Sequence, residues 1–113
     1  MALLLPLDDD GRPMPILGFR FRGCQKIPLT GTSARNATPI DPATRVVTIA
    51  TTGNCRFEVG DAGVTADAVQ SAFLLANSYV DIPLTATERH VAFIADGGGS
   101  GDAYIIERNF PAA

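Results

Sequence analysis

Two groups of acidic residues in this chain have a spacing that could bind a cation. Residues 8–11 read Asp-Asp-Asp-Gly, and Asp96 and Asp102 flank a glycine-rich stretch. A calcium loop of the EF-hand type needs oxygen ligands at alternate positions and a closing glutamate, and residues 8–11 have neither. Aspartates beside a turn more often accept hydrogen bonds from their own backbone. We therefore expect no metal and no other cofactor, and leave open whether Asp96 and Asp102 meet across their turn.

Residues 97–101, Gly-Gly-Gly-Ser-Gly, have the composition of a phosphate-binding loop but not its pattern. A P-loop continues with Lys and with Ser or Thr at the start of a helix. Here Asp102 and a run of apolar residues follow. We expect a chain reversal between two strands, because glycine takes positive φ without strain.

His90 is the only histidine, and Cys24 and Cys55 are the only cysteines. A nucleophilic site would need the imidazole beside a thiol or hydroxyl, with a carboxylate to orient it. Glu88 is close to His90 in the sequence, but no motif supplies the nucleophile. We therefore predict no enzymatic activity, with His90 a solvent-facing or interface residue of a strand. Because no export signal is evident, both cysteines are expected to be free thiols.

Basic residues gather in the N-terminal part of the chain. Residues 1–45 hold six basic and four acidic side chains, net +2, whereas residues 46–113 hold three basic and eight acidic ones, net −5. A nucleic-acid platform combines basic with aromatic side chains, and a basic strip on an acidic body with few aromatic neighbours fits this poorly. We expect the strip to meet an acidic protein surface instead. It consists of Arg12, Arg20, Arg22 and Lys26.

Length and composition fit one globular domain. Of the 113 residues, 46% are hydrophobic and 19% charged, with 11 Gly and 8 Pro. This composition is rich in turns and poor in long amphipathic helices. The apolar residues 1–7 have no basic region before them and run into aspartates, so we expect no signal peptide. No segment is long and apolar enough to suggest a membrane span.

Alternating apolar residues predict strands over residues 44–110. The segment 44–52 is rich in β-branched residues, and 55–60 and 79–84 alternate between apolar and polar side chains. Residues 71–77 are too few for periodicity to separate a strand from a short buried helix.

The last two strands, in residues 87–110, are expected to form a hairpin around the glycine-rich turn, with Val91, Phe93 and Ile105 in the core. Short strands separated by turns, without alternating helices, are typical of an antiparallel β-sandwich of jelly-roll or Ig-like form, and a closed barrel is the next option. We therefore predict an all-β fold whose body spans residues 44–113.

Prolines interrupt residues 1–43, which we expect to form an extended N-terminal arm and a linker. Residues 1–7 and 15–23 are too apolar for an inert disordered tail. Contiguous exposed apolar surface marks a partner site, so we expect the arm to dock on another subunit. The alternative is that residues 16–22 form the first strand of the body. The candidate docking residues are Leu3, Leu4, Leu5, Ile16, Leu17, Phe19, Arg20, Phe21 and Arg22.

The segments of residues 45–108 follow a specific order. Thr-Gly-Asn-Cys at 52–55 ends one strand, Leu-Ala-Asn at 75–77 precedes another, and Ile-Pro-Leu at 82–84 comes before the glycine-linked pair. In this order the chain resembles small β-sandwich proteins encoded among the virion structural genes of tailed bacteriophages. The resemblance implies a capsid decoration (cement) protein, or another head or connector component, with no enzymatic role.

From this resemblance we expect a decoration protein on the outer capsid surface of a virion, made in the cytoplasm of the host bacterium. Its partners would be the major capsid protein and neighbouring copies of itself, with no small-molecule substrate, no nucleic acid and no membrane. A head-to-tail connector or tail ring is the first alternative. A small ligand- or carbohydrate-binding sandwich is the second, but such sites need exposed aromatic residues, and the chain has no Trp and only 2 Tyr.

Overall fold

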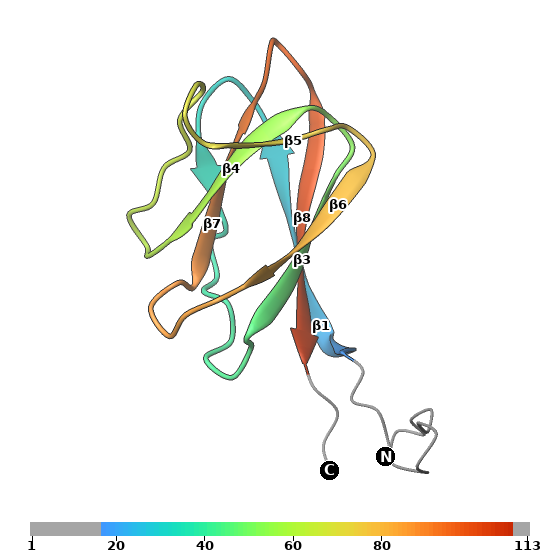
Figure 1. Cartoon of the computed structure of the whole chain (residues 1–113), viewed down its shortest axis with the longest axis vertical. Helices are drawn as coiled ribbons and strands as arrows, with labels where there is room; N and C mark the ends of the chain where they lie inside the picture. Colours follow the sequence, from blue (N-terminus) through green and yellow to red (C-terminus); the bar gives the residue numbers. More distant parts are fainter. Residues whose placement is uncertain (1–16, 110–113) are drawn as a thin grey trace, which may run out of the picture.

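The computed structural model describes residues 17–109, which form eight β-strands and no helix (Figure 1). The strands are β1 (Gly18–Leu29), β2 (Ala34–Arg35), β3 (Val46–Thr51), β4 (Cys55–Gly60), β5 (Ala72–Leu74), β6 (Ser78–Pro83), β7 (His90–Ala95) and β8 (Gly101–Asn109). They make two four-stranded antiparallel sheets, ordered β1-β8-β3-β6 and β2-β7-β4-β5. The predicted all-β antiparallel sandwich is confirmed.

The strand pairing identifies this sandwich as a jelly roll. β1 pairs with β8, β2 with β7, β3 with β6 and β4 with β5, so the chain is one long hairpin folded at its middle. Rolling up that hairpin brings β8 beside β3 and β7 beside β4. This eight-strand arrangement is the double-sheet jelly roll, one of the two sandwich forms that the sequence left open.

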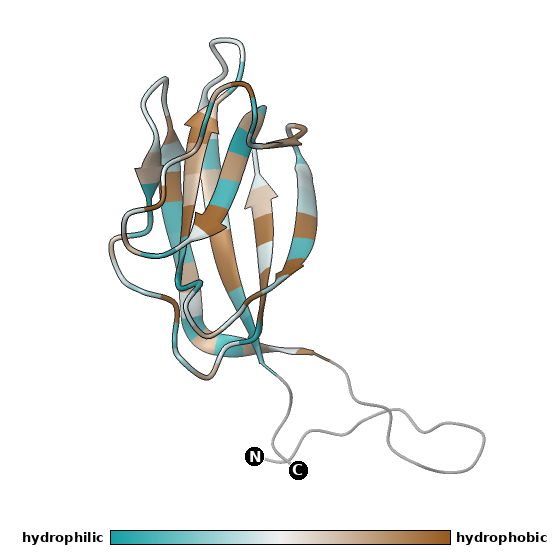
Figure 2. Cartoon of the chain, turned by 60° about the vertical axis from the view of Figure 1, so that its left-hand side comes forward, coloured by the Kyte–Doolittle hydropathy of each residue, from teal (hydrophilic) through white to brown (hydrophobic). Residues whose placement is uncertain are grey.

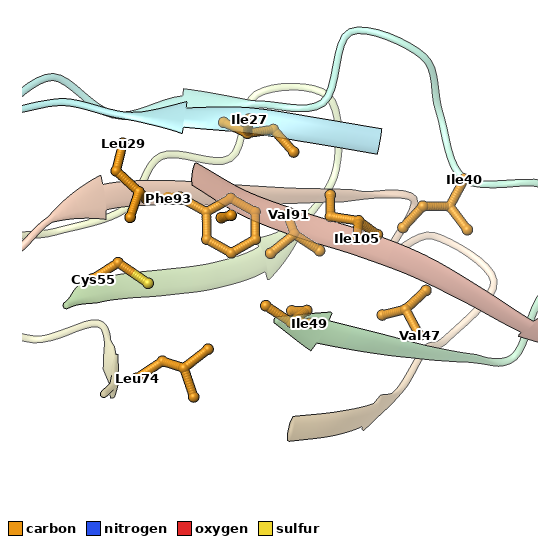
Figure 3. Packing of buried hydrophobic residues seen from close by; sticks show 11 residues of the cluster. Ile27, Leu29, Ile40, Val47, Ile49, Cys55, Leu74, Val91, Phe93 and Ile105 are labelled. Carbon is orange, nitrogen blue, oxygen red and sulfur yellow. The ribbon is translucent and has the colours of Figure 1, made fainter. Parts of the chain in front are cut away.

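The core lies between the two sheets, where alternate residues of each strand point inward. Phe93 and Val91 of β7 and Cys55 of β4 form one fully buried cluster with Ile49 and Ile105 of the opposite sheet (Figure 3). The core positions predicted on the last two strands are therefore confirmed. The same alternation appears as brown and teal bands along the strands in Figure 2.

The glycine-rich segment 97–101 does not join a hairpin, so that prediction is wrong. β7 belongs to one sheet and β8 to the other, and the segment connects the two sheets at one end of the sandwich. Local alternation cannot show which sheet a strand joins, because pairing partners are distant in sequence. The positive φ values that glycine permits do occur here, at Gly97, Gly98 and Gly101.

Residues 18–43 belong to the sandwich, where the sequence predicted an arm and a linker. Apart from one bulge β1 pairs with β8 along its length, and its Ile27 and Leu29 enter the core, as does Ile40 from the loop before β3. Pro28 is tolerated in β1 because β1 is an edge strand, and Pro39 and Pro42 lie in the loop before β3. The remainder of the predicted arm, residues 1–16, lies outside the described residues.

Two loops at one end of the sandwich touch at Gly53. A Cβ at this position would lie 2.0 Å from the main-chain oxygen of Ser100, which has no side-chain freedom with which to yield. We expect Gly53→Ala to lower the free energy of unfolding by about 1–3 kcal/mol, as overpacking does, measured by urea denaturation. Gly31→Ala is the matched control, because its Cβ would have no atom within 4 Å. Equal losses of stability in both variants would contradict this contact.

Candidate protein-docking surface

The outer face of the sheet β2-β7-β4-β5 is closed by the protein's own chain. Residues 61–71 connect β4 to β5, and this segment is tied down where the main-chain N–H of Ala66 donates to Ser33 Oγ (2.8 Å). His90 and Ala92 point away from the core between inward-facing neighbours, yet they are only 7% and 0% exposed. The protein's own chain therefore covers this face over His90 and Ala92, while Phe73 of β5, 46% exposed, stays accessible at its edge.

The outer face of the sheet β1-β8-β3-β6 keeps apolar side chains accessible. Residues paired on neighbouring antiparallel strands share a face, so the strand register defines rows of outward side chains. One row comprises Lys26, Tyr104, Ala50 and Tyr79, and the next comprises Cys24, Ile106, Thr48 and Asp81. Tyr79 is 71% exposed, and Tyr104 and Ile106 are half-buried. We call the surface formed by Val46, Ala50, Tyr79, Tyr104 and Ile106 the open face.

β1 leaves the regular ladder near its start. Its register with β8 shifts between Phe19 and Cys24, and Arg22 in this bulge has φ 56°, a left-handed conformation that is uncommon outside glycine. Phe19 and Phe21 are 70% and 84% exposed. Bulges at sheet edges re-aim side chains. Two phenyl rings thus stand exposed at the β1 edge of the sheet that carries the open face.

Arg108 of β8 fixes the start of β1. Its Nε donates to the carbonyl of Gly18 (3.1 Å) and its Nη2 to the carbonyl of Leu17 (3.0 Å). The guanidinium carbon lies 4.2 Å from the centre of the Phe19 ring, and Nη1 donates to Thr48 Oγ1 on β3 (3.0 Å). Arg108 therefore contacts the start of β1, the exposed Phe19 ring and the central strand β3, and it fixes their positions relative to one another. Nothing in the sequence singled out Arg108, because its partners are about 60 to 90 positions away.

Glu107 points to the opposite side of β8 from Arg108, and it holds the same end of β1 through buried hydrogen bonds. Its carboxylate accepts hydrogen bonds from Thr44 Oγ1 (2.7 Å), from the main-chain N–H of Asp41 (3.1 Å) and from Arg20 Nη1 (3.1 Å). The Glu107 side chain is 4% exposed. A buried carboxylate needs such partners, since an unpaired one would be strongly disfavoured. The network ties β1 to the loop before β3 at the end of the sandwich where β1 starts.

The predicted docking residues divide into four sets. Phe19, Phe21 and Arg22 are exposed, at the edge of the open face. Arg20 instead points to the Glu107 network and also lies 3.4 Å from Asp41, so it is engaged within the molecule. Leu17 is half-buried at the start of β1. The others, which lie outside the described residues, are Leu3, Leu4, Leu5 and Ile16.

A groove of about 520 Å³ lies beside the bulge of β1. Its lining is Arg20, Arg22, Gly23, Gln25, Thr38, Pro39, Asp41, Pro42 and Glu107. Both carboxylates in this lining, Asp41 and Glu107, pair with Arg20, and with Arg22 the four charged side chains of the groove sum to zero. Arg22 forms no ion pair with any residue of the described range 17–109, and its guanidinium carbon lies 5.1 Å from the centre of the Phe21 ring. The Arg22 guanidinium is therefore available to a partner next to the exposed phenyl rings.

The side chains considered for metal binding and catalysis do not converge. Asp96, which follows β7, pairs with Arg56 of β4 (3.1 Å). Asp102 of β8 belongs to the other sheet, where it lies 3.9 Å from Lys26 of the neighbouring strand β1. Among residues 17–109, no group of three or more His, Cys, Asp or Glu side chains is placed to hold a metal ion. His90 is buried, so its predicted solvent-facing or interface position is wrong. Alternation along its strand could not reveal that the outer face of that sheet is closed.

Cys24 and Cys55 are free thiols, as predicted. Cys24 is exposed on β1, in the row of Ile106 on the outer face, and Cys55 is fully buried in the core. Burial raises the pKa of both thiols, which lowers the thiolate fraction at neutral pH. Neither thiol therefore has the lowered pKa of a catalytic nucleophile.

Comparisons with known proteins were made for the whole chain. No family model matches it, and no curated protein matches it. A solved structure from Bacillus endospore appendages, described as a novel family of disulfide-linked pili, aligns with 97% of this chain and 100% of its own, at 14% identity and a TM-score of 0.47. A likeness at this level carries no argument about function. The resemblance to phage virion proteins stays a prediction.

Fold and surface together define a jelly-roll domain with one closed outer face and one open face edged by exposed phenylalanines. No helix within residues 17–109 is long and apolar enough to cross a membrane.

The buried network makes Glu107 a test of how the β1 end is held. Glu107→Gln keeps the shape of the side chain but removes the charge that Arg20 faces and replaces one acceptor with a donor. We expect it to lower the free energy of unfolding by about 1–3 kcal/mol, measured by urea denaturation. Asp102→Asn, which alters a pair with the largely exposed Lys26, is the control and should cost less than about 1 kcal/mol. The network would be refuted by a Glu107 variant as stable as that control.

Proposed function

We propose that this protein is a structural component of a tailed-phage virion that decorates the outer surface of the capsid. The observation that carries the proposal is the pair of exposed phenyl rings, Phe19 and Phe21, beside Arg22, which forms no ion pair within residues 17–109. Arg108 holds this edge in place, and a rigid surface that presents aromatic side chains is suited to binding another protein. Viral capsid domains often have jelly-roll folds, but that is a likeness of fold alone.

The partner would be the major capsid protein of the shell. Phenylalanine side chains supply apolar area at the centre of a contact, and Arg22 favours an acidic rim. Leu3, Leu4, Leu5, Ile16 and Leu17 complete the docking set of the predicted arm.

Decoration explains why a small contact would suffice. A single domain that docks through an edge and a short segment binds weakly, but a shell repeats the same site by symmetry. If neighbouring copies also contact each other, many weak contacts act together. The bound copies would bridge capsid subunits and oppose the internal pressure of the packaged DNA.

The structure sharpens the design of the binding test. A deletion of residues 1–22 would also remove the start of β1 and the contact of Arg20 with Glu107, so loss of binding could reflect damage to the fold. Phe21→Asp in the full chain avoids this problem, because Phe21 is 84% exposed. We expect this variant to bind purified capsids at least about tenfold more weakly, measured by co-sedimentation, with little change in stability.

Val69→Asp is the matched control for Phe21→Asp. Val69 is 77% exposed and lies in the loop between β4 and β5, next to the closed face, so its variant should bind as the unaltered protein does. Quantitative mass spectrometry of purified virions completes the test. Hundreds of copies per particle support decoration, whereas about a dozen indicate a connector or tail ring. Absence from the virion, or full binding by Phe21→Asp, would overturn the proposal.

A further inference from the structure

We infer that the open face binds the N-terminal segment of a second copy of this chain. In this contact the apolar residues 1–7 lie on Tyr79, Tyr104 and Ile106, and the aspartates at 8–10 lie near the basic side chains of the same surface. The inference is independent of the proposed capsid docking, because it concerns the protein alone. It moves Leu3, Leu4 and Leu5 from the predicted capsid docking set to a contact with a neighbouring copy and leaves the phenylalanine edge, which the capsid-binding test probes, for the shell.

The open face is a row of apolar side chains across one sheet that the described residues leave uncovered. The opposite sheet buries His90 and Ala92 on its outer side. The sheet of the open face instead leaves Tyr79 71% exposed and Tyr104 and Ile106 half-buried. Contiguous apolar surface of this kind marks a contact site.

The size of the open face argues for a segment as its occupant. Four strands about 4.8 Å apart and six residues of about 3.3 Å each give a sheet of roughly 400 Å². A stable protein contact buries about 800 Å² per partner. Two open faces packed flat on each other would therefore be too small, whereas an added segment that follows the sheet enlarges the contact.

The chemistry of the N-terminal segment complements this surface. Its sequence places Met-Ala-Leu-Leu-Leu-Pro-Leu directly before three aspartates, so an apolar stretch is followed by a charge of −3. The sheet of the open face presents its aromatic and aliphatic side chains beside Lys26, which lies 3.9 Å from Asp102, and beside Asp81, whose side chain is 52% exposed. Arg22 at the bulge forms no ion pair among residues 17–109, so the aspartates of the segment are favoured at that end of the sheet while the apolar residues lie on the rows, which favours one register of binding.

The reach of the N-terminal segment allows binding to either copy, and its direction favours a second copy. The 16 residues before Leu17 can span about 50 Å when extended, well beyond the roughly 20 Å height of the sheet. Arg108 fixes the carbonyls of Leu17 and Gly18 at the end of the sandwich where β1 starts (Figure 1). To reach its own open face the chain must reverse there, whereas a neighbour's face is met without a reversal. Two copies that exchange segments would form a closed two-fold dimer.

The mass of the purified full chain in solution, from sedimentation velocity, tests this inference. We expect a dimer for the full chain and a folded monomer after deletion of residues 1–16, for Leu4→Asp and for Tyr79→Asp. Val69→Asp, on the other side of the sandwich, should remain a dimer. A monomeric full chain, a dimer that survives the deletion, or equal dissociation by Val69→Asp would each overturn the inference.

A disulfide cross-link distinguishes exchange from folding back. Leu4→Cys places a thiol on the segment, and the native Cys24 is exposed in the outer-face row of Ile106, while Cys55 is buried. Oxidation by copper phenanthroline and oxygen should give a covalent dimer on non-reducing gels, and the dimer should be lost when Cys24→Ser is added. A cross-link confined to single chains, or dimers that persist with Cys24→Ser, would contradict binding to a second copy.

Discussion

The ladder between β1 and β8 is the constraint on which the remaining structure depends, because it joins the two ends of the described chain. The other strand pairs are nested between these two strands along the chain, down to β4 and β5. Two adjacent residues of β8 secure the ladder from opposite sides. Glu107 binds Arg20 inside the sandwich, and Arg108 binds the first carbonyls of β1 outside it. The bulge of β1 lies beside these two residues and turns the phenylalanines toward solvent. The contacts that hold the start of β1 therefore also hold the exposed edge in place.

Much of the fold could be predicted from local sequence, because alternation fixes which side of a strand is buried. Val91, Phe93 and Ile105 were placed correctly for this reason. Pairing between strands could not be predicted, because it depends on residues far apart in the chain. The glycine-rich connection between β7 and β8 therefore looked like a hairpin, and β1 was assigned to the arm.

In the candidate docking surface, too, features set by local sequence could be predicted and features set by distant residues could not. Phe19, Phe21 and Arg22 were recognisable as an apolar and basic stretch, and they are exposed. The inward orientation of the Arg20 side chain could not be predicted, because its partner Glu107 is 87 positions away in the sequence. The helix-or-strand choice for residues 71–77 was decided by pairing as well, since Ala72–Leu74 adds to β4 as β5.

The two outer faces of the sandwich differ in how much of their area the protein's own chain covers. The proposed function uses this difference. In the proposed function, the sheet that is largely covered by the protein's own chain would face solvent and the open side would face partners. The exposed rings at the β1 edge would face the shell, and the open face would receive a neighbouring copy. Neither role requires a catalytic group.

Hydroxyl-radical footprinting of the free protein and of the protein on purified virions tests this directional surface most directly. We expect oxidation of Phe21 to fall strongly on the virion, while Val69 and Phe73 on the side of the closed face keep their reactivity. Equal oxidation of Phe21 in both states, or protection of Val69 and Phe73 in its place, would contradict the assignment of this edge as the docking surface.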